Sequence, residues 1–284
     1  MSKGVKEYKE YFDKENLEET KSVVSSETET IEEETPIPEQ SSAKPKKCMK
    51  LTKPSKKPKK ETPEQKKARV KTEISELHQR YKTLNSQNLH QEFNSEPTLW
   101  HTYHEISEAN EQSFPENEIP RNRIIQELHK LTSKSTKTVV DMGCGKGQIS
   151  SYFSNDRRFI FKNYDHVSSN DTIISCDISK IPLEEDSVDI CILSLSMWGS
   201  NCKEYLTEAF RVLDSQGYLY IIEPTRRWSE KDDNNGILPG TEGIKLKALL
   251  EETGFHIFTA PSEATTSAES IPKFCMFRCC KMPK

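Results

Sequence analysis

The sequence lacks long apolar runs and is poor in hydrophobic residues as a whole. Only 33% of its 284 residues are hydrophobic, which is too few to fold the entire chain but enough for one domain of roughly 150 to 200 residues. No apolar run approaches the roughly 20 residues of a membrane span, and residues 1–10 lack the apolar centre of a signal peptide. We therefore expect a soluble, intracellular protein without a membrane segment.

The chain also lacks any Cys-x-x-Cys pair, although it contains eight cysteines. Most of these cysteines fall in predicted strands, and none has the spacing of zinc ligands. The pattern is typical of a reducing compartment and predicts no metal site.

Aromatic residues are almost absent between Phe12 and residue 70, where Glu, Lys, Ser, Thr and Pro dominate. Such a segment cannot bury enough apolar surface to offset chain entropy, so we expect a disordered tail. The net charge of -4 hides an asymmetry, because residues 15–39 are acidic whereas residues 44–60 hold nine lysines and no acid. The lysines predict salt-sensitive, sequence-independent contact with nucleic acid, and the alternative is a solvated linker.

A short apolar run, Thr138–Met142, breaks into the alternating glycines Gly143, Gly145 and Gly147. The run predicts a buried strand, and the glycines let the backbone turn tightly and approach a ligand closely. A dinucleotide site is disfavoured, because Gln148 stands where that fingerprint needs glycine. With an acid two residues before the first glycine, the motif instead resembles the cofactor loop of class I methyltransferases, which bind S-adenosylmethionine.

Acidic residues end the next two predicted strands, as Asp165 and Asp177. A carboxylate at the end of the second strand suits the two ribose hydroxyls of a nucleoside cofactor. Asp177 is expected to accept a hydrogen bond from the adenine amine while Ile178 covers the ring. The alternative for either aspartate alone is a helix cap or a turn residue.

The fourth predicted strand, Val188–Leu195, runs into Ser194–Gly199 at the edge of the sheet where ligands bind. We expect a target base to enter here, with Met197 or Trp198 stacking on it; the alternative is that both only pack the rim. Arg226 and Arg227 follow the fifth strand and are expected to bind RNA, unless they belong to an ordinary solvated loop.

Ahead of the glycine loop, apolar residues recur at near-helical intervals from Ile74 to Leu89 and predict a helix. Residues 92–104 concentrate aromatics and histidines, which predicts either a lid over the cofactor or an extension that only packs.

The alternation of strands and helices predicts an α/β fold, a Rossmann-like seven-stranded sheet with helices on both faces that ends in an antiparallel pair. The predicted parts are a disordered tail (1–70), a helical extension and lid (71–132) and a methyltransferase domain (133–284).

Five segments carry a closer resemblance: Val140–Gly145, Cys176–Ser179, Ile181–Asp189, Leu193–Asn201 and Tyr205–Leu213. They resemble the rRNA-processing protein 8 family, called nucleomethylin in animals. The resemblance implies methylation of N1 of an adenine in large-subunit rRNA, a partner in the pre-ribosomal particle, and a nuclear, nucleolar location. It implies cofactor contacts at six positions: His104, Gly143, Asp165, Asp177, Ile178 and Ser194. A cysteine of the family is replaced by Ser194, so the chain is a diverged member.

Adenine N1 carries a lone pair and no proton, so no catalytic acid or base is predicted. Two other functions stay open on the sequence alone. One is a methyltransferase acting on a small molecule or a protein, and the other is a non-catalytic S-adenosylmethionine-binding scaffold in a nuclear RNA or chromatin complex.

Overall fold

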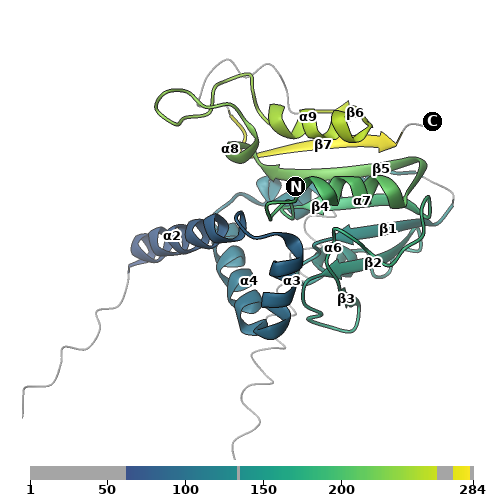
Figure 1. The fold of residues 1–284 in the computed structure, drawn as a ribbon, viewed down its shortest axis with the longest axis horizontal. Helices are drawn as coiled ribbons and strands as arrows, with labels where there is room; N and C mark the ends of the chain where they lie inside the picture. Colours follow the sequence, from purple (N-terminus) through teal and green to yellow (C-terminus); the bar gives the residue numbers. More distant parts are fainter. Residues whose placement is uncertain (1–61, 133–134, 261–270, 282–284) are drawn as a thin grey trace, which may run out of the picture. The chain divides into compact units, whose positions relative to one another are not determined.

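The computed structural model describes residues 62–132, 135–260 and 271–281 (Figure 1). Seven strands form one sheet in the order β3-β2-β1-β4-β5-β7-β6. They are β1 (Lys137–Met142), β2 (Phe159–Asp165), β3 (Ile173–Ser175), β4 (Val188–Ser194), β5 (Leu213–Pro224), β6 (Phe255–Thr259) and β7 (Phe274–Lys281). The helices are α2 (Pro63–Tyr81), α3 (Ser86–Ser95), α4 (Pro97–Glu111), η1 (Glu116–Glu118), α5 (Pro120–His129), α6 (Gln148–Tyr152), α7 (Lys203–Val212), α8 (Thr225–Trp228) and α9 (Ile244–Thr253).

The direction of strand order reverses at β1, which pairs in parallel with both β2 and β4. The chain runs outward from β1 through β2 to β3 and then returns to place β4 on the other side of β1. Ligands of open α/β sheets bind outside the carboxyl ends of the strands at such a reversal. The predicted antiparallel finish is also present, with β7 inserted between β5 and β6.

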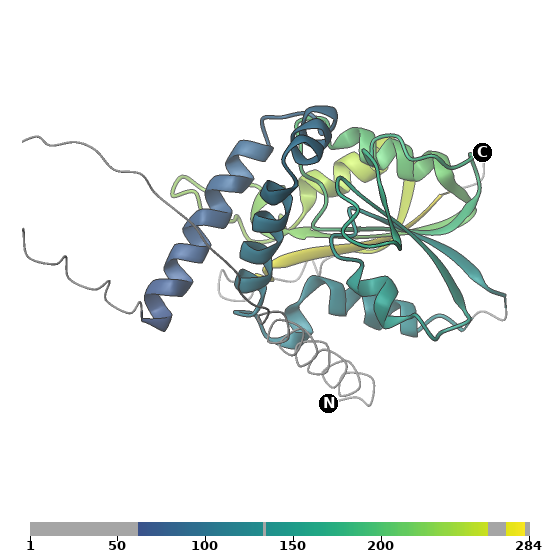
Figure 2. The ribbon, with the colours of Figure 1, turned by 90° about the horizontal axis from the view of Figure 1, so that it is seen from below.

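The sheet is covered on both faces, by α5 and α6 on one side and by α7 and α9 on the other (Figure 2). Its central strand, β4, is therefore apolar from Ile190 to Leu193, and Ile192 and Leu193, whose side chains point to opposite faces, are fully buried. Burying one such side chain contributes about 1.5–3 kcal/mol. The fold class predicted from the sequence is confirmed.

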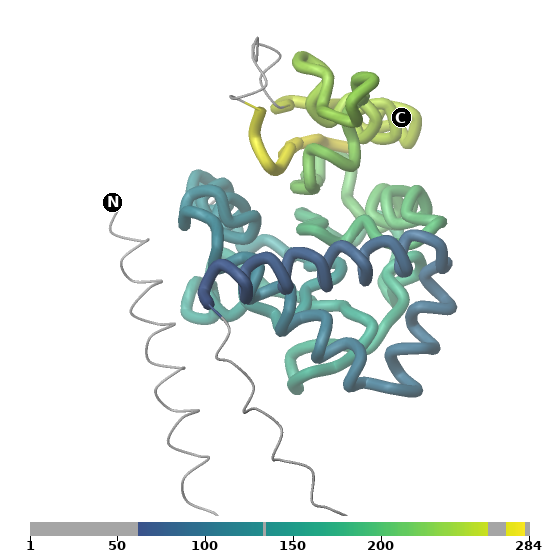
Figure 3. Tube along the Cα trace, turned by 90° about the vertical axis from the view of Figure 1, so that its left-hand side faces the viewer, coloured from purple at the N-terminus to yellow at the C-terminus, as the bar shows by residue number. Residues whose placement is uncertain are grey.

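Three helices that precede the sheet in the sequence, α2, α3 and α4, form a separate layer, in which α2 packs beside α4 (Figure 3). A small apolar cluster that includes Tyr81, Phe93 and Trp100 holds this layer together. The prediction of one helix through Leu89 is wrong, because the chain leaves the helix after Tyr81 and Asn85 starts α3 by accepting a hydrogen bond from the Asn88 backbone N–H. No helix of the described ranges is long and apolar enough to cross a membrane.

Helix α2 begins at Pro63, inside the range assigned to the tail, with Thr62 and Gln65 forming a reciprocal capping box. The lysine-rich stretch and the acidic stretch before it lie outside the described residues. The division of the chain at residues 70 and 132 stays a prediction.

Candidate functional site

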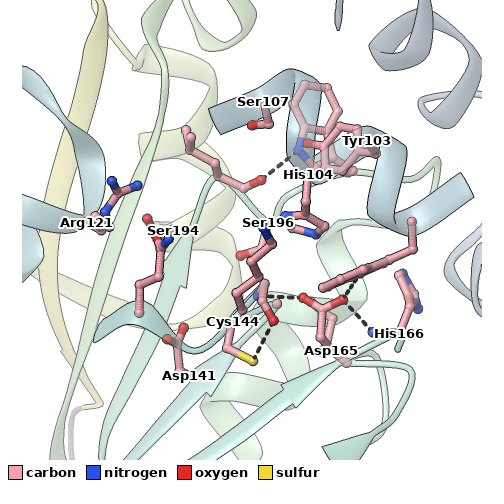
Figure 4. Close-up of a pocket in the computed structure, with 18 of the residues that line it drawn as sticks. Tyr103, His104, Ser107, Arg121, Asp141, Cys144, Asp165, His166, Ser194 and Ser196 are labelled. Carbon is pink, nitrogen blue, oxygen red and sulfur yellow. Dashed lines mark hydrogen bonds between the residues drawn. The ribbon is translucent and has the colours of Figure 1, made fainter. Parts of the chain in front are cut away.

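A cavity of about 180 Å³ lies where the carboxyl ends of β1, β2 and β4 meet the covering helix α4 (Figure 4). The sheet side supplies the glycine loop after β1, the end of β2 and the loop after β4. The helical side supplies Trp100, Tyr103 and His104 from α4 and Arg121 from α5. Of the six predicted cofactor contacts, the cavity wall contains five: His104, Gly143, Asp165, Ile178 and Ser194.

The glycine loop is as tightly packed as its sequence predicts. Gly143 and Gly145 have φ angles of +79° and +59°, which residues with a side chain rarely adopt. A Cβ atom on Gly143 would lie 2.5 Å from the Cβ of Ser196, in the loop after β4. A Cβ atom on Gly145 would lie 3.0 Å from the His104 ring. The loop thus packs directly against Ser196 and against His104, and only glycine allows so close an approach at these two positions.

Asp165 connects the glycine loop to the covering helix. One carboxylate oxygen accepts a hydrogen bond from the Gly145 backbone N–H at 2.8 Å, and the other accepts from the Trp100 indole N–H at 2.7 Å and from the His166 backbone N–H at 2.7 Å. Burial raises the pKa of Asp165 to about 6, although these hydrogen bonds act in the opposite direction. Two carboxylate oxygens offer about four lone-pair sites, so the group can accept further hydrogen bonds from a ligand.

His104 faces the cavity from α4, with its ring centroid 4.0 Å from that of Trp100. Burial first, and then the nearby cation of Lys146, lowers the pKa of His104 to about 3. The imidazole is therefore neutral at pH 7. Together with Trp100 and Tyr103 it forms an aromatic cover, which excludes water from this side of the cavity.

Three polar groups in the cavity wall have no hydrogen-bond partner within the described part of the chain. They are the Tyr81 hydroxyl, Ser196 Oγ and Asp141 Oδ1, the last in a residue that is 1% exposed. Burial, followed by the charge of Asp165, raises the pKa of Asp141 to about 7. In the sequence, Asp141 stands out only as part of the glycine motif, and its position two residues before Gly143 is the available signal.

A family model described as "Hypothetical methyltransferase" matches residues 64–238. The chain belongs to this family. The "25S rRNA (adenine(645)-N(1))-methyltransferase" of Schizosaccharomyces pombe is 33% identical over 155 residues, which are 52% of this chain and 48% of that protein. The "Ribosomal RNA-processing protein 8" of Arabidopsis thaliana is 37% identical over 144 residues, which are 51% of this chain and 46% of that protein. The chain thus spans about half the length of these curated relatives.

Membership of this methyltransferase family confirms the resemblance noted in the sequence, and S-adenosylmethionine is the corresponding cofactor. The cavity fits that group. S-adenosylmethionine combines an adenosine, a cationic sulfonium and an amino acid and carries no phosphate. An unpartnered carboxylate oxygen on Asp141, a second buried carboxylate on Asp165 and the apolar wall at Ile178 match these parts. No cluster of His, Cys, Asp and Glu that could hold a metal ion occurs in the described ranges.

Asp177 lies outside the cavity wall. Its carboxylate accepts hydrogen bonds from the Ser86 hydroxyl at 2.9 Å and from the Ser179 backbone N–H at 2.9 Å. Asp177 therefore joins the first turn of α3 to the loop after β3. Contact with an adenine amine at this position stays a prediction.

The four residues predicted on the substrate side are in four different environments. Trp198 lines the cavity at its rim. Arg227 lies 4.8 Å from the Trp198 ring centroid, whereas Arg226 is exposed and donates a hydrogen bond to the Asn235 carbonyl. Met197 is fully buried in the core and donates its backbone N–H to Glu223, which favours the alternative that it only packs; a contact of its side chain with a base stays a prediction. The Met197 side chain packs in the hydrophobic core cluster that also contains Leu193 and Tyr205.

Substituting Gly143 by alanine should weaken the binding of S-adenosylhomocysteine by about 10- to 100-fold, because the added Cβ displaces Ser196. Gly240→Ala is the matched control, because Gly240 has a similar φ of +83° but nothing within 4 Å of a Cβ. Titration calorimetry of both variants separates backbone strain from loss of space. Equal affinities of Gly143→Ala and the wild type would contradict the placement of the cofactor.

The raised pKa of Asp141 predicts a pH-dependent stability. An unfolded Asp has a pKa of about 3.9, so the native state holds the proton more tightly and loses stability as pH rises toward about 7. Asp141→Asn removes this loss, and its free energy of unfolding in urea should fall less between pH 5 and pH 8 than that of the wild type. Asp171→Asn, which changes an exposed carboxyl, is the control. Parallel profiles for Asp141→Asn and the wild type would show that Asp141 is not a buried, weakly acidic group.

Proposed function

We propose that this chain is an S-adenosylmethionine-dependent methyltransferase that modifies N1 of an adenine in large-subunit rRNA. The observation that carries the proposal is the cavity at the β1–β4 strand-order reversal, closed by the glycine loop and by Asp165, in a chain whose relatives include proteins named 25S rRNA (adenine-N1)-methyltransferases. The Saccharomyces cerevisiae relative of that name is 26% identical over 202 residues.

In this proposal the wall residues hold the cofactor in distinct ways. Asp165 accepts from ribose hydroxyls, Ile178 packs against the adenine, and Asp141 faces the amino group. Gly143 provides close backbone approach, and His104 and Ser194 complete the wall on the covering-helix and β4 sides. When bound, S-adenosylmethionine supplies an electrophilic methyl group on a sulfonium sulfur.

Besides binding the cofactor, the protein has to position the adenine. Adenine N1 has a lone pair and carries no proton at neutral pH, so its attack needs no general base. The protein must take the base out of its stack, hold adenine N1 about 3–3.5 Å from the methyl carbon and exclude water. The aromatic cover on α4, formed by the buried Trp100 with Tyr103 and His104, contributes to the last requirement by shielding this side of the cavity from water.

The partner in this proposal is rRNA within a pre-ribosomal particle, and the location is the nucleolus. The relatives named ribosomal RNA-processing protein 8 support both. The lysine-rich tail, which lies outside the described residues, is proposed to add sequence-independent contact with RNA.

The test is incubation of the purified protein with tritiated S-adenosylmethionine and with total RNA from cells that lack this protein. Nucleoside analysis of the RNA follows. We expect label in 1-methyladenosine of large-subunit rRNA, and none with Gly143→Arg, which fills the glycine loop. Label in a different nucleoside would overturn the adenine-N1 assignment but keep the methyltransferase. Cofactor binding without label in any RNA would contradict the proposed activity and favour a scaffold.

A further inference from the structure

Trp198, at the rim of the cavity, is covered by a side chain from the helical layer. Its indole N–H donates a hydrogen bond to the Leu195 carbonyl at 2.6 Å, which fixes the orientation of the ring. The His78 imidazole from α2 stacks on this ring, with 3.8 Å between the centroids and 18° between the planes. This near-parallel stack joins α2 to the loop after β4, and the two residues are far apart in the sequence.

The geometry of the stack is that of a nucleobase on an aromatic side chain. Burial lowers the pKa of His78 to about 4, with further lowering by Lys82 and then Arg227. The imidazole is therefore neutral at pH 7, as nucleobases are, and it is a planar heteroaromatic ring. Proteins that bind single-stranded nucleic acid use the same contact, in which bases stack on Trp, Tyr or Phe.

Two cations flank the stacked pair. Lys82 Nζ is 5.9 Å from the Trp198 ring centroid, and the Arg227 guanidinium carbon is 4.8 Å from it. Within the described ranges neither residue forms an ion pair with a carboxylate, and Arg227 Nη1 is buried without a hydrogen-bond partner. By contrast, both arginines of α2 form ion pairs, Arg69 with Glu73 and Arg80 with Glu92. Arg227 Nη2 donates to Cys202 Sγ at 3.8 Å, and the charge of Arg227 acts on the buried Glu223 carboxyl. Cations that lie beside a stacking surface without a direct ion pair suit a phosphate-bearing ligand.

We propose that Trp198 is a stacking platform for a nucleobase of single-stranded RNA, that His78 occupies this platform in the free protein, and that Lys82 and Arg227 bind the adjoining phosphate. This proposal rests on the proposed function, because it places the RNA at the mouth of the cofactor cavity. A base must displace His78 before it can stack, so the intramolecular contact lowers the apparent affinity for RNA. His78 then acts through Trp198, because only a ligand with an aromatic ring can take its place on the indole.

The first test is fluorescence anisotropy with the full chain and a labelled oligoadenylate of about five nucleotides. Removing the competitor in His78→Ala should tighten binding by about 3- to 10-fold, and removing the platform in Trp198→Leu should weaken it about tenfold. His256→Ala, which removes an exposed imidazole on β6, is the matched control and should bind as the wild type does. An abasic oligonucleotide with the same phosphates should bind all of these variants equally.

A second measurement uses the unaltered protein, so it does not depend on the folding of any variant. Photo-crosslinking with an oligonucleotide that carries 8-azidoadenosine should label the peptide that contains Trp198. Three results would overturn the platform: unchanged or weaker binding by His78→Ala, equal effects of the substitutions on the abasic oligonucleotide, or a crosslink at another site.

The two proposals fail separately. Methyl transfer to rRNA with a crosslink away from Trp198 would overturn the platform and leave the enzyme. Binding and crosslinking as expected, with no methyl transfer to any RNA, would keep the platform and overturn the proposed activity.

Discussion

The buried carboxylate of Asp165 is the contact on which the cavity depends. It accepts hydrogen bonds from the glycine loop, from the end of its own strand and from the indole of Trp100 on the covering helix. Three elements that share no local sequence are thereby held at one point. Because the group is buried apart from its face toward the cavity, removing it would leave the Trp100 and Gly145 donors unsatisfied as well as removing a ligand contact, and each such donor costs about 1–3 kcal/mol. Cofactor binding and closure of the cavity are therefore linked through the same side chain.

The site combines buried, weakly charged groups in its interior with cations at its rim. Burial lowers the pKa of His104 and raises those of Asp141 and Asp165, so each of these groups is biased toward its uncharged form. At the rim, Lys82 and Arg227 lie beside Trp198 without a carboxylate partner in the described part of the chain. A dry interior suits a compact cofactor, and a cationic aromatic rim suits a strand of nucleic acid.

The sequence predicted the parts of the fold that depend on local patterns. The apolar run at Val188 and the glycines at 143–147 mark a buried strand and a tight turn, and both are present. The break between α2 and α3 was missed, because the apolar spacing continues through it and only the capping by Asn85 ends the pattern. Whether Met197 stacks on a base or only packs was left open, since residue type does not reveal which way a loop turns.

The contacts that define the site join residues far apart in the chain. Trp100 and Asp165 are separated by 65 positions, and no periodicity or motif links them. The same holds for His78 and Trp198. Sequence patterns predicted the individual strands, the turn and the acidic end of β2, whereas the pairing of the helical layer with the rim follows from packing alone.

A crystal structure of the protein with S-adenosylhomocysteine tests the central claim most directly. We predict that the ribose hydroxyls donate to Asp165, that the amino group lies at Asp141, and that the ligand contacts the backbone at Gly143. A ligand bound elsewhere, or one in this cavity with no contact to Asp165, would contradict the assignment of the site.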